Sequence, residues 1–281
     1  MNWLTDYKIP LGDWANEGVN WLTNHATWFF DAVSIAIETF IDGVLWILQT
    51  PPPLLTIAIV TLGAYLVRRS IAFTVFVALS LLLIVNQGYW EETTETLSLI
   101  LCSTFVCMLI GVPVGVYSAH HPRFFAAIRP VLDLMQTIPT FVYLIPALIL
   151  FGLGVVPGLI STVVFALPAS IRLTQIGISS TPVDLLEAGE AFGATYWQKL
   201  TKIELPYAMP NILAGLTQTI MLSLSMVVIA ALVGADGLGV PTLRALNTVN
   251  ISQGFEVGIA IVLIAIILDR FFRANDAGGN R

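Results

Sequence analysis

Long apolar segments dominate the chain and restrict it to a membrane fold. Hydrophobic residues make up 57% of the sequence and charged residues 11%, about half of the charged share of a soluble domain. Most of these segments approach the roughly 20 residues with which a helix crosses about 30 Å of hydrocarbon. They lie near residues 53–67, 70–85, 97–119, 134–151, 157–175, 212–233 and 255–268. The sequence therefore predicts an all-α polytopic membrane protein with about seven spans.

Basic residues indicate which side of the membrane each loop faces. If the polar loop at 177–211 is cytoplasmic, ten of the twelve Lys and Arg residues lie on that side, and only Lys8 and Arg244 lie outside. Because cytoplasmic loops are enriched in Lys and Arg, this orientation is favoured over its reverse. With seven spans, the N-terminus is then expected outside and the C-terminus in the cytoplasm.

The N-terminal segment is expected to contain an amphipathic helix at 28–48, outside the seven spans. Its acids Asp31, Glu38 and Asp42 fall within about 40° of one another on a helical wheel and form a narrow polar stripe. Interfacial helices on the anionic inner leaflet usually carry basic residues, so this acidic stripe favours a position along the outer leaflet. An eighth span, with its acids against a partner helix, is the alternative.

A polar segment at 187–206 interrupts the apolar spans and is typical of two short helices joined by a turn. Gly193 can take the left-handed conformation that ends the first helix. The small residues Ala188 and Gly189 allow another backbone to approach closely. The segment therefore suits docking into a groove on another protein.

Capping signals set the expected bounds of these two helices. Ser180 and Thr181 offer N-cap oxygens to the first helix, with Pro182 at its first helical position. Thr195 and Gln198 fit a capping box for the second. That second helix is expected to close before Pro206, because the residue before a proline avoids the helical region.

The same segment resembles a known signature. It matches the EAA pattern E-A-A-x3-G-x9-I-x-L-P of the membrane subunits of binding-protein-dependent ABC importers, with Gly189 in place of the second Ala. The runs at 133–146 and 224–239 further resemble permeases that import glycine betaine, proline and choline. The resemblance implies that the loop docks onto a cytoplasmic ATPase. The expected coupling residues are Glu187, Ala188, Gly189, Phe192, Gly193, Ile203, Leu205 and Pro206.

The resemblance also implies the domain organisation and the assembly. Four parts are expected: an external tail (1–52), a helical hairpin with an outer loop (53–95), a core permease domain (96–273) with a coupling loop at 177–211, and a cytoplasmic tail (274–281). The implied partners are a second copy of the chain, two ABC ATPase subunits, an external substrate-binding protein and membrane lipid, without nucleic acid. The implied location is the bacterial inner membrane. The chain itself is expected to hold no cofactor and no catalytic residues, since ATP and Mg²⁺ would bind to the ATPase.

The resemblance implies a quaternary or methylated ammonium cargo. Choline or glycine betaine is preferred, and proline betaine, carnitine or trimethylamine N-oxide are alternatives. Aromatic faces bind such cations with about 0.5–2 kcal/mol per ring, so the pathway needs no matching anion. A bend is expected near the cytoplasmic mouth at 136–139. The pathway candidates, for which helix packing is the competing interpretation, are Gln136, Thr137, Pro139, Phe141, Tyr143, Met221, Ser223, Ser225 and Met226.

Two other classes of function compete with an importer subunit. An ion-coupled secondary transporter of small amines would usually place ionisable residues at mid-membrane, whereas Asp133, Arg172 and Asp269 are expected at the ends of spans. A membrane enzyme would need a catalytic set of residues, and the sequence has no such pattern. It also contains no GxxxxGK[ST] motif, so an ATPase would have to be a separate chain.

Overall fold

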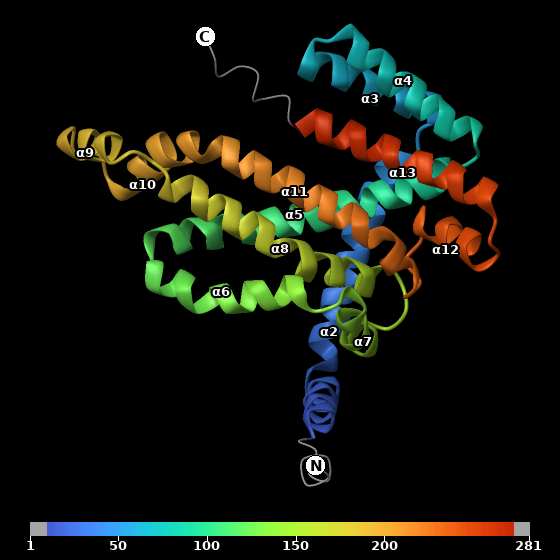
Figure 1. Ribbon diagram of the computed structural model, residues 1–281, viewed down its shortest axis with the longest axis horizontal. Coiled ribbons are helices and arrows are strands. Elements are labelled where there is room, and N and C mark those ends of the chain that lie inside the picture. Colours follow the sequence, from blue (N-terminus) through green and yellow to red (C-terminus); the bar gives the residue numbers. More distant parts are fainter. Residues whose placement is uncertain (1–9, 273–281) are drawn as a thin grey trace, which may run out of the picture.

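The computed structural model describes residues 10–272, and this part of the chain is helical with short connections (Figure 1). The elements in chain order are α2 (Leu11–Gln49), α3 (Pro53–Arg68), α4 (Ile71–Asn86), α5 (Trp90–His120), α6 (Pro122–Thr137), α7 (Thr140–Phe151), α8 (Val155–Ser179), α9 (Val183–Ala191), α10 (Tyr196–Lys199), the π-helical turn η1 (Leu200–Glu204), α11 (Leu205–Ala231), α12 (Gly239–Asn247) and α13 (Ile251–Phe272).

Three long helices, α5, α8 and α11, form the centre of the molecule. Gly111 and Gly115 let α5 approach α8 closely: a Cβ atom at Gly115 would lie 2.7 Å from the Ile171 carbonyl oxygen, and one at Gly111 would lie 2.0 Å from Ser170 Oγ. Small residues at a helix interface allow this close approach and are typical of packing between membrane helices. In Figure 1, α9 and α10 lie at one end of this bundle and α12 lies at the other.

By length and composition, four helical segments of the described chain can cross a membrane: α5, α8, the continuous stretch Tyr196–Ala231 and α13. The number rises to six if two bent helix pairs, α2–α3 and α6–α7, each count as one span. The sequence predicted about seven. The difference arises at α3 and α4, which have only 16 residues each and pack together as a hairpin.

The pair α6–α7 bends by 95° at Ile138 and Pro139. A bend was predicted at 136–139 and is present. The span predicted at 134–151 covers only the last residues of α6 together with α7. Helix α6 already begins at Pro122 and packs against α8, so residues 122–133 are helical and belong to the same helix as the first part of the predicted span. Pro122 occupies the first turn of α6, where no backbone donor is needed, and Pro130 lies inside the helix.

Helix α2 is longer than the predicted segment at 28–48 and contains a kink at Ala26 (φ −125°, ψ 19°). It makes an angle of 96° with α3, and in Figure 1 it runs across the direction of α5, α8 and α11. Polar contacts fix it to the first turns of α5: Ser98 Oγ donates to the Ile41 carbonyl at 3.0 Å, and Gln49 Nε2 donates to Thr94 Oγ1 at 2.9 Å.

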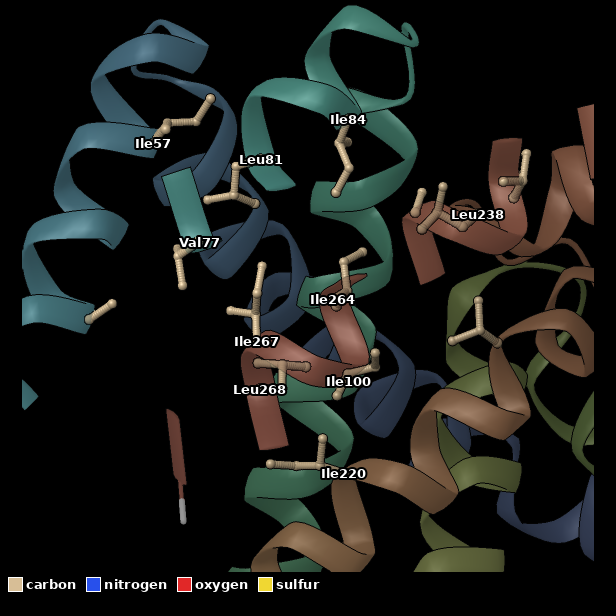
Figure 2. Packing of buried hydrophobic residues seen from close by; sticks show 14 of the residues in the cluster. Ile57, Val77, Leu81, Ile84, Ile100, Ile220, Leu238, Ile264, Ile267 and Leu268 are labelled. Atoms are coloured by element: carbon tan, nitrogen blue, oxygen red, sulfur yellow. The ribbon is translucent and has the colours of Figure 1, made fainter. Parts of the chain in front are cut away.

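A hydrophobic core joins the α3–α4 hairpin to the central bundle. Figure 2 shows side chains from several helices meeting, among them Val77 and Leu81 of α4, Ile100 of α5, and Ile264 and Ile267 of α13. Val77 and Ile100 are fully buried. Burying each such side chain contributes about 1.5–3 kcal/mol, and the hairpin is therefore an integral part of the fold.

Candidate coupling loop and pathway

The coupling loop begins with α9, whose start differs from the prediction. Ser180 does not cap α9, because its hydroxyl donates to the Gly177 carbonyl at 2.8 Å and so satisfies the end of α8. Thr181 is buried, and its hydroxyl has no hydrogen-bond partner. Pro182 is the N-cap residue in an extended conformation (φ −59°, ψ 136°) instead of the first helical residue.

The end of α9 follows the prediction. Gly193 has φ +74°, in the left-handed region. The Gly193 N–H bonds to the Glu190 carbonyl and the Ala194 N–H to the Gly189 carbonyl, both at 2.9 Å. This pair of bonds is the Schellman motif, which satisfies the last carbonyls of the helix. The loop therefore turns sharply at Gly193.

The second half of the loop confirms one prediction and corrects another. Thr195 and Gln198 form the capping box, with the Thr195 N–H donating to Gln198 Oε1 at 2.8 Å and the Gln198 N–H to Thr195 Oγ1 at 3.4 Å. The helix does not close before Pro206. The Leu205 N–H bonds five residues back to Leu200, so η1 continues directly into α11. Pro206 is the second residue of α11 and follows directly after the π-helical turn η1.

Contacts between α9 and η1 hold the two halves of the loop together. Gly189 is buried, and a Cβ atom there would lie 2.6 Å from Ile203 Cδ1. Lys199 forms an ion pair with Glu190. The fold thus brings together two predicted coupling residues, Gly189 and Ile203, that are far apart in the signature.

The outer surface of the loop is apolar as well as exposed. Phe192, a predicted coupling residue, is 92% exposed. Trp197, at 69% exposed, and Tyr196 lie close by on α10 and were not predicted. Adjacent aromatic residues inside a polar segment were the signal that could have identified them. Large exposed apolar side chains of this kind are typical of protein or membrane interaction sites.

The pathway candidates fall into two groups in the described chain. Ser223 and Met226 are buried between helices, and Ser103 Oγ donates to Ser223 Oγ at 3.2 Å. The remaining candidates are at least partly accessible: Gln136, Thr137, Pro139, Phe141, Tyr143, Met221 and Ser225. Tyr143 has a structural contact, because its hydroxyl donates to the Met135 carbonyl at 2.7 Å across the α6–α7 break.

An ion pair connects α6 to α8. Arg172 Nη2 lies 2.6 Å from Asp133 Oδ1, and both side chains are partly exposed. The expectation that these two charges lie at the ends of spans was inaccurate: Asp133 lies inside α6, and Arg172 is followed by seven further residues of α8. The α6–α8 contact is therefore not purely apolar.

Comparison with known proteins defines the class of protein to which this fold and loop belong. Residues 111–278 match the family described as "Binding-protein-dependent transport system inner membrane component", and the chain belongs to this family. It is the membrane-embedded permease subunit of an ATP-driven ABC importer, and ATP is hydrolysed by a separate subunit.

Two relatives are similar over nearly the whole chain. The glycine betaine transport system permease protein OpuAB of Bacillus subtilis is 45% identical over 94% of this chain and 93% of its own length. The glycine betaine/proline betaine permease protein ProW of Escherichia coli is 42% identical over 95% of this chain and 75% of its own. Among solved structures, the inward-facing MetNI methionine ABC transporter matches with a TM-score of 0.57 and 25% identity, over 64% of this chain and 92% of that one.

Proposed function

We propose that the cargo is a methylated, zwitterionic ammonium compound, with glycine betaine as the first candidate. The observation that carries this proposal is the 45% identity to a glycine betaine permease over almost the full length of both chains. Other relatives are named for glycine betaine and carnitine in Listeria monocytogenes and for trimethylamine N-oxide in Ruegeria pomeroyi. None of these relatives is named for choline, so choline becomes the second candidate.

The proposed assembly contains two copies of this chain, two ATPase subunits and an external binding protein. Each chain contributes one coupling loop, so two loops in a dimer meet two ATPases. The orientation that suits this assembly has α9 and α10 in the cytoplasm and α12 outside, at the opposite end of the bundle. In the proposed arrangement α2, which makes an angle of 96° with α3, lies along the outer leaflet rather than forming an eighth span.

The proposed coupling residues act through the shape of the loop. Phe192 would enter a groove on the ATPase, and Gly193 would hold the turn behind it. The remaining predicted members of this set, which support the α9–η1 contact and the entry into α11, are Glu187, Ala188, Gly189, Ile203, Leu205 and Pro206. Because η1 continues into α11, displacement of the loop would move a spanning helix directly.

Transport then follows as a shift between two conformations. ATP binding closes the ATPase pair. The closed pair binds the outward-facing state of the permease more tightly than the inward-facing state, and this difference raises the population of the outward-facing state. Domain movements of this kind occur about a few flexible positions, and the α6–α7 break at Ile138 and Pro139 is such a position. The accessible pathway candidates on α6, α7 and α11 would line the route of the cargo.

Reconstitution into vesicles tests the function. We expect uptake of labelled glycine betaine only when this chain, its ATPase, its binding protein and ATP are all present, and we expect proline betaine and carnitine to compete better than choline. Omission of the ATPase is the matched control. Uptake by this chain alone, driven by an ion gradient, would instead support the alternative of a secondary transporter.

A further inference from the structure

A buried carboxylate lies at the base of the coupling loop. Glu204 is the last residue of η1, is only 7% exposed, and joins the loop to α11. A carboxylate in such a position is costly unless an opposite charge or a donor accompanies it. π-helical turns such as η1 are also frequently found at functional positions.

The partner of Glu204 is His120, the last residue of α5. His120 Nε2 lies 3.0 Å from Glu204 Oε2, and this oxygen has no other partner and no well-aligned hydrogen bond. The contact is therefore defined by the 3.0 Å distance between these two atoms. It connects two elements that are more than eighty residues apart in sequence, the cytoplasmic end of α5 and the turn that carries the loop.

Both ring nitrogens of His120 face acceptors. Nδ1 lies 2.9 Å from the Val116 carbonyl, which can only accept, so Nδ1 carries a hydrogen. A neutral ring with that hydrogen would present the lone pair of Nε2 to the carboxylate of Glu204. The contact is favourable only when a further proton lies between Nε2 and Oε2. The other titratable group facing the ring is Tyr196 of α10, with ring centroids 5.5 Å apart.

The surrounding contacts between α5 and the loop are apolar. Ile178 and Leu200 pack with Val112 and Val116 of α5 in a small hydrophobic cluster. Apolar contacts are non-directional, so the two surfaces can slide past each other. The contact between one oxygen of Glu204 and one nitrogen of His120 instead fixes the position of η1 relative to α5.

We propose that His120 and Glu204 are positioning residues that share a proton and transmit the movement of the coupling loop to α5. This inference rests on the proposed function, since it assumes that an ATPase moves the loop. When the pair is intact, displacement of α9 and η1 moves α5 and α11 together. When it is broken, α11 moves without α5, and ATP is hydrolysed without a matching amount of import.

The chain supplies a matched control in the neighbouring residue. The His121 ring is exposed, lies 3.0 Å from the Tyr117 carbonyl through Nδ1 and stacks on the Tyr117 ring, and it forms no ion pair within the described residues. It has the same chemistry and almost the same location as His120 but does not bridge to the loop. A substitution there removes a histidine from the end of α5 without breaking the bridge.

The test measures glycine betaine imported per ATP hydrolysed by the complete complex in vesicles. We expect His120→Leu to lower this ratio by about fivefold or more while ATP hydrolysis continues, and His121→Leu to leave it unchanged. Glu204→Leu, which removes the other member of the pair, should lower the ratio to a similar extent.

The outcomes separate the two proposals. Equal ratios for His120→Leu and His121→Leu, or an unchanged ratio for Glu204→Leu, would overturn the inference and leave the importer intact. Glu204→Leu decides the matter if His120→Leu does not assemble. Absence of ATP-driven import by the unaltered complex would instead refute the proposed function, and the inference with it.

Discussion

At the scale of single residues, Gly193 carries the largest backbone constraint in the coupling loop. Its φ of +74° lies in the left-handed region, and no atom lies within 4 Å of where a Cβ would be. A side chain there would therefore meet no steric obstacle from neighbouring residues. The cost of a substitution comes from the backbone conformation alone.

We expect Gly193→Val to destabilise the turn by about 1–2 kcal/mol, because a β-branched residue disfavours positive φ. ATP-driven import should fall while the amount of protein in the membrane is unchanged. Gly193→Asn is the matched control, since asparagine visits the left-handed region more readily. Import at the unaltered rate by the valine variant would show that the turn at Gly193 is not needed for coupling.

Local sequence signals predicted the loop well where each residue acts on its neighbours. The capping box of Thr195 and Gln198 and the turn at Gly193 depend on residues at most five positions apart, and both are present. Ser180 was assigned wrongly because it lies between two helices, and its hydroxyl bonds to the end of α8 rather than to the start of α9. The contact of His120 with Glu204 had no local signal, since it depends on how α5 meets η1.

At the scale of elements, the close contact of α5 with α8 depends on small side chains. The position of a Cβ at Gly115 is blocked by the Ile171 carbonyl and by Thr174, which belong to a packed helix. Because the obstacle includes backbone, a larger residue must push the two helices apart. Overpacking of this type costs about 1–3 kcal/mol.

We expect Gly115→Leu to lower the thermal unfolding temperature of the detergent-purified protein, in line with that cost. Gly63→Leu on α3 is the control, because no atom lies within 4 Å of its Cβ position. The two variants add the same apolar volume to a helix, so the comparison isolates helix packing. Equal unfolding temperatures would contradict the close α5–α8 contact.

The length of an apolar segment predicted a span correctly only where a single helix covers the whole apolar segment. Helices α5, α8 and α13 were located in this way, because each presents a long uninterrupted apolar window. The first part of α6 lay outside the predicted span at 134–151, because Arg123, Arg129 and Asp133 interrupt its apolar sequence. Its ion pair to Arg172 on α8 is a tertiary contact, and apolar length carries no information about it.

At the scale of the whole molecule, the coupling loop and α12 lie at opposite ends of the helical bundle. The mechanism requires the loop to be cytoplasmic, where ATP is available, and the α12 end to face the binding protein. The family of the chain is established by its similarity to known permease subunits. The proposed orientation is predicted from the distribution of basic residues and is the central claim of the mechanism.

Labelling of single introduced cysteines in intact cells tests that claim most directly. Phe192 is 92% exposed on the loop and Leu246 is 71% exposed on α12, while the native Cys102 and Cys107 are buried. A membrane-impermeant maleimide should label Leu246→Cys from outside, and should label Phe192→Cys only after the cells are opened. Labelling of Phe192→Cys in sealed cells would contradict the account, because the loop would then lie on the side of the membrane that has no ATPase.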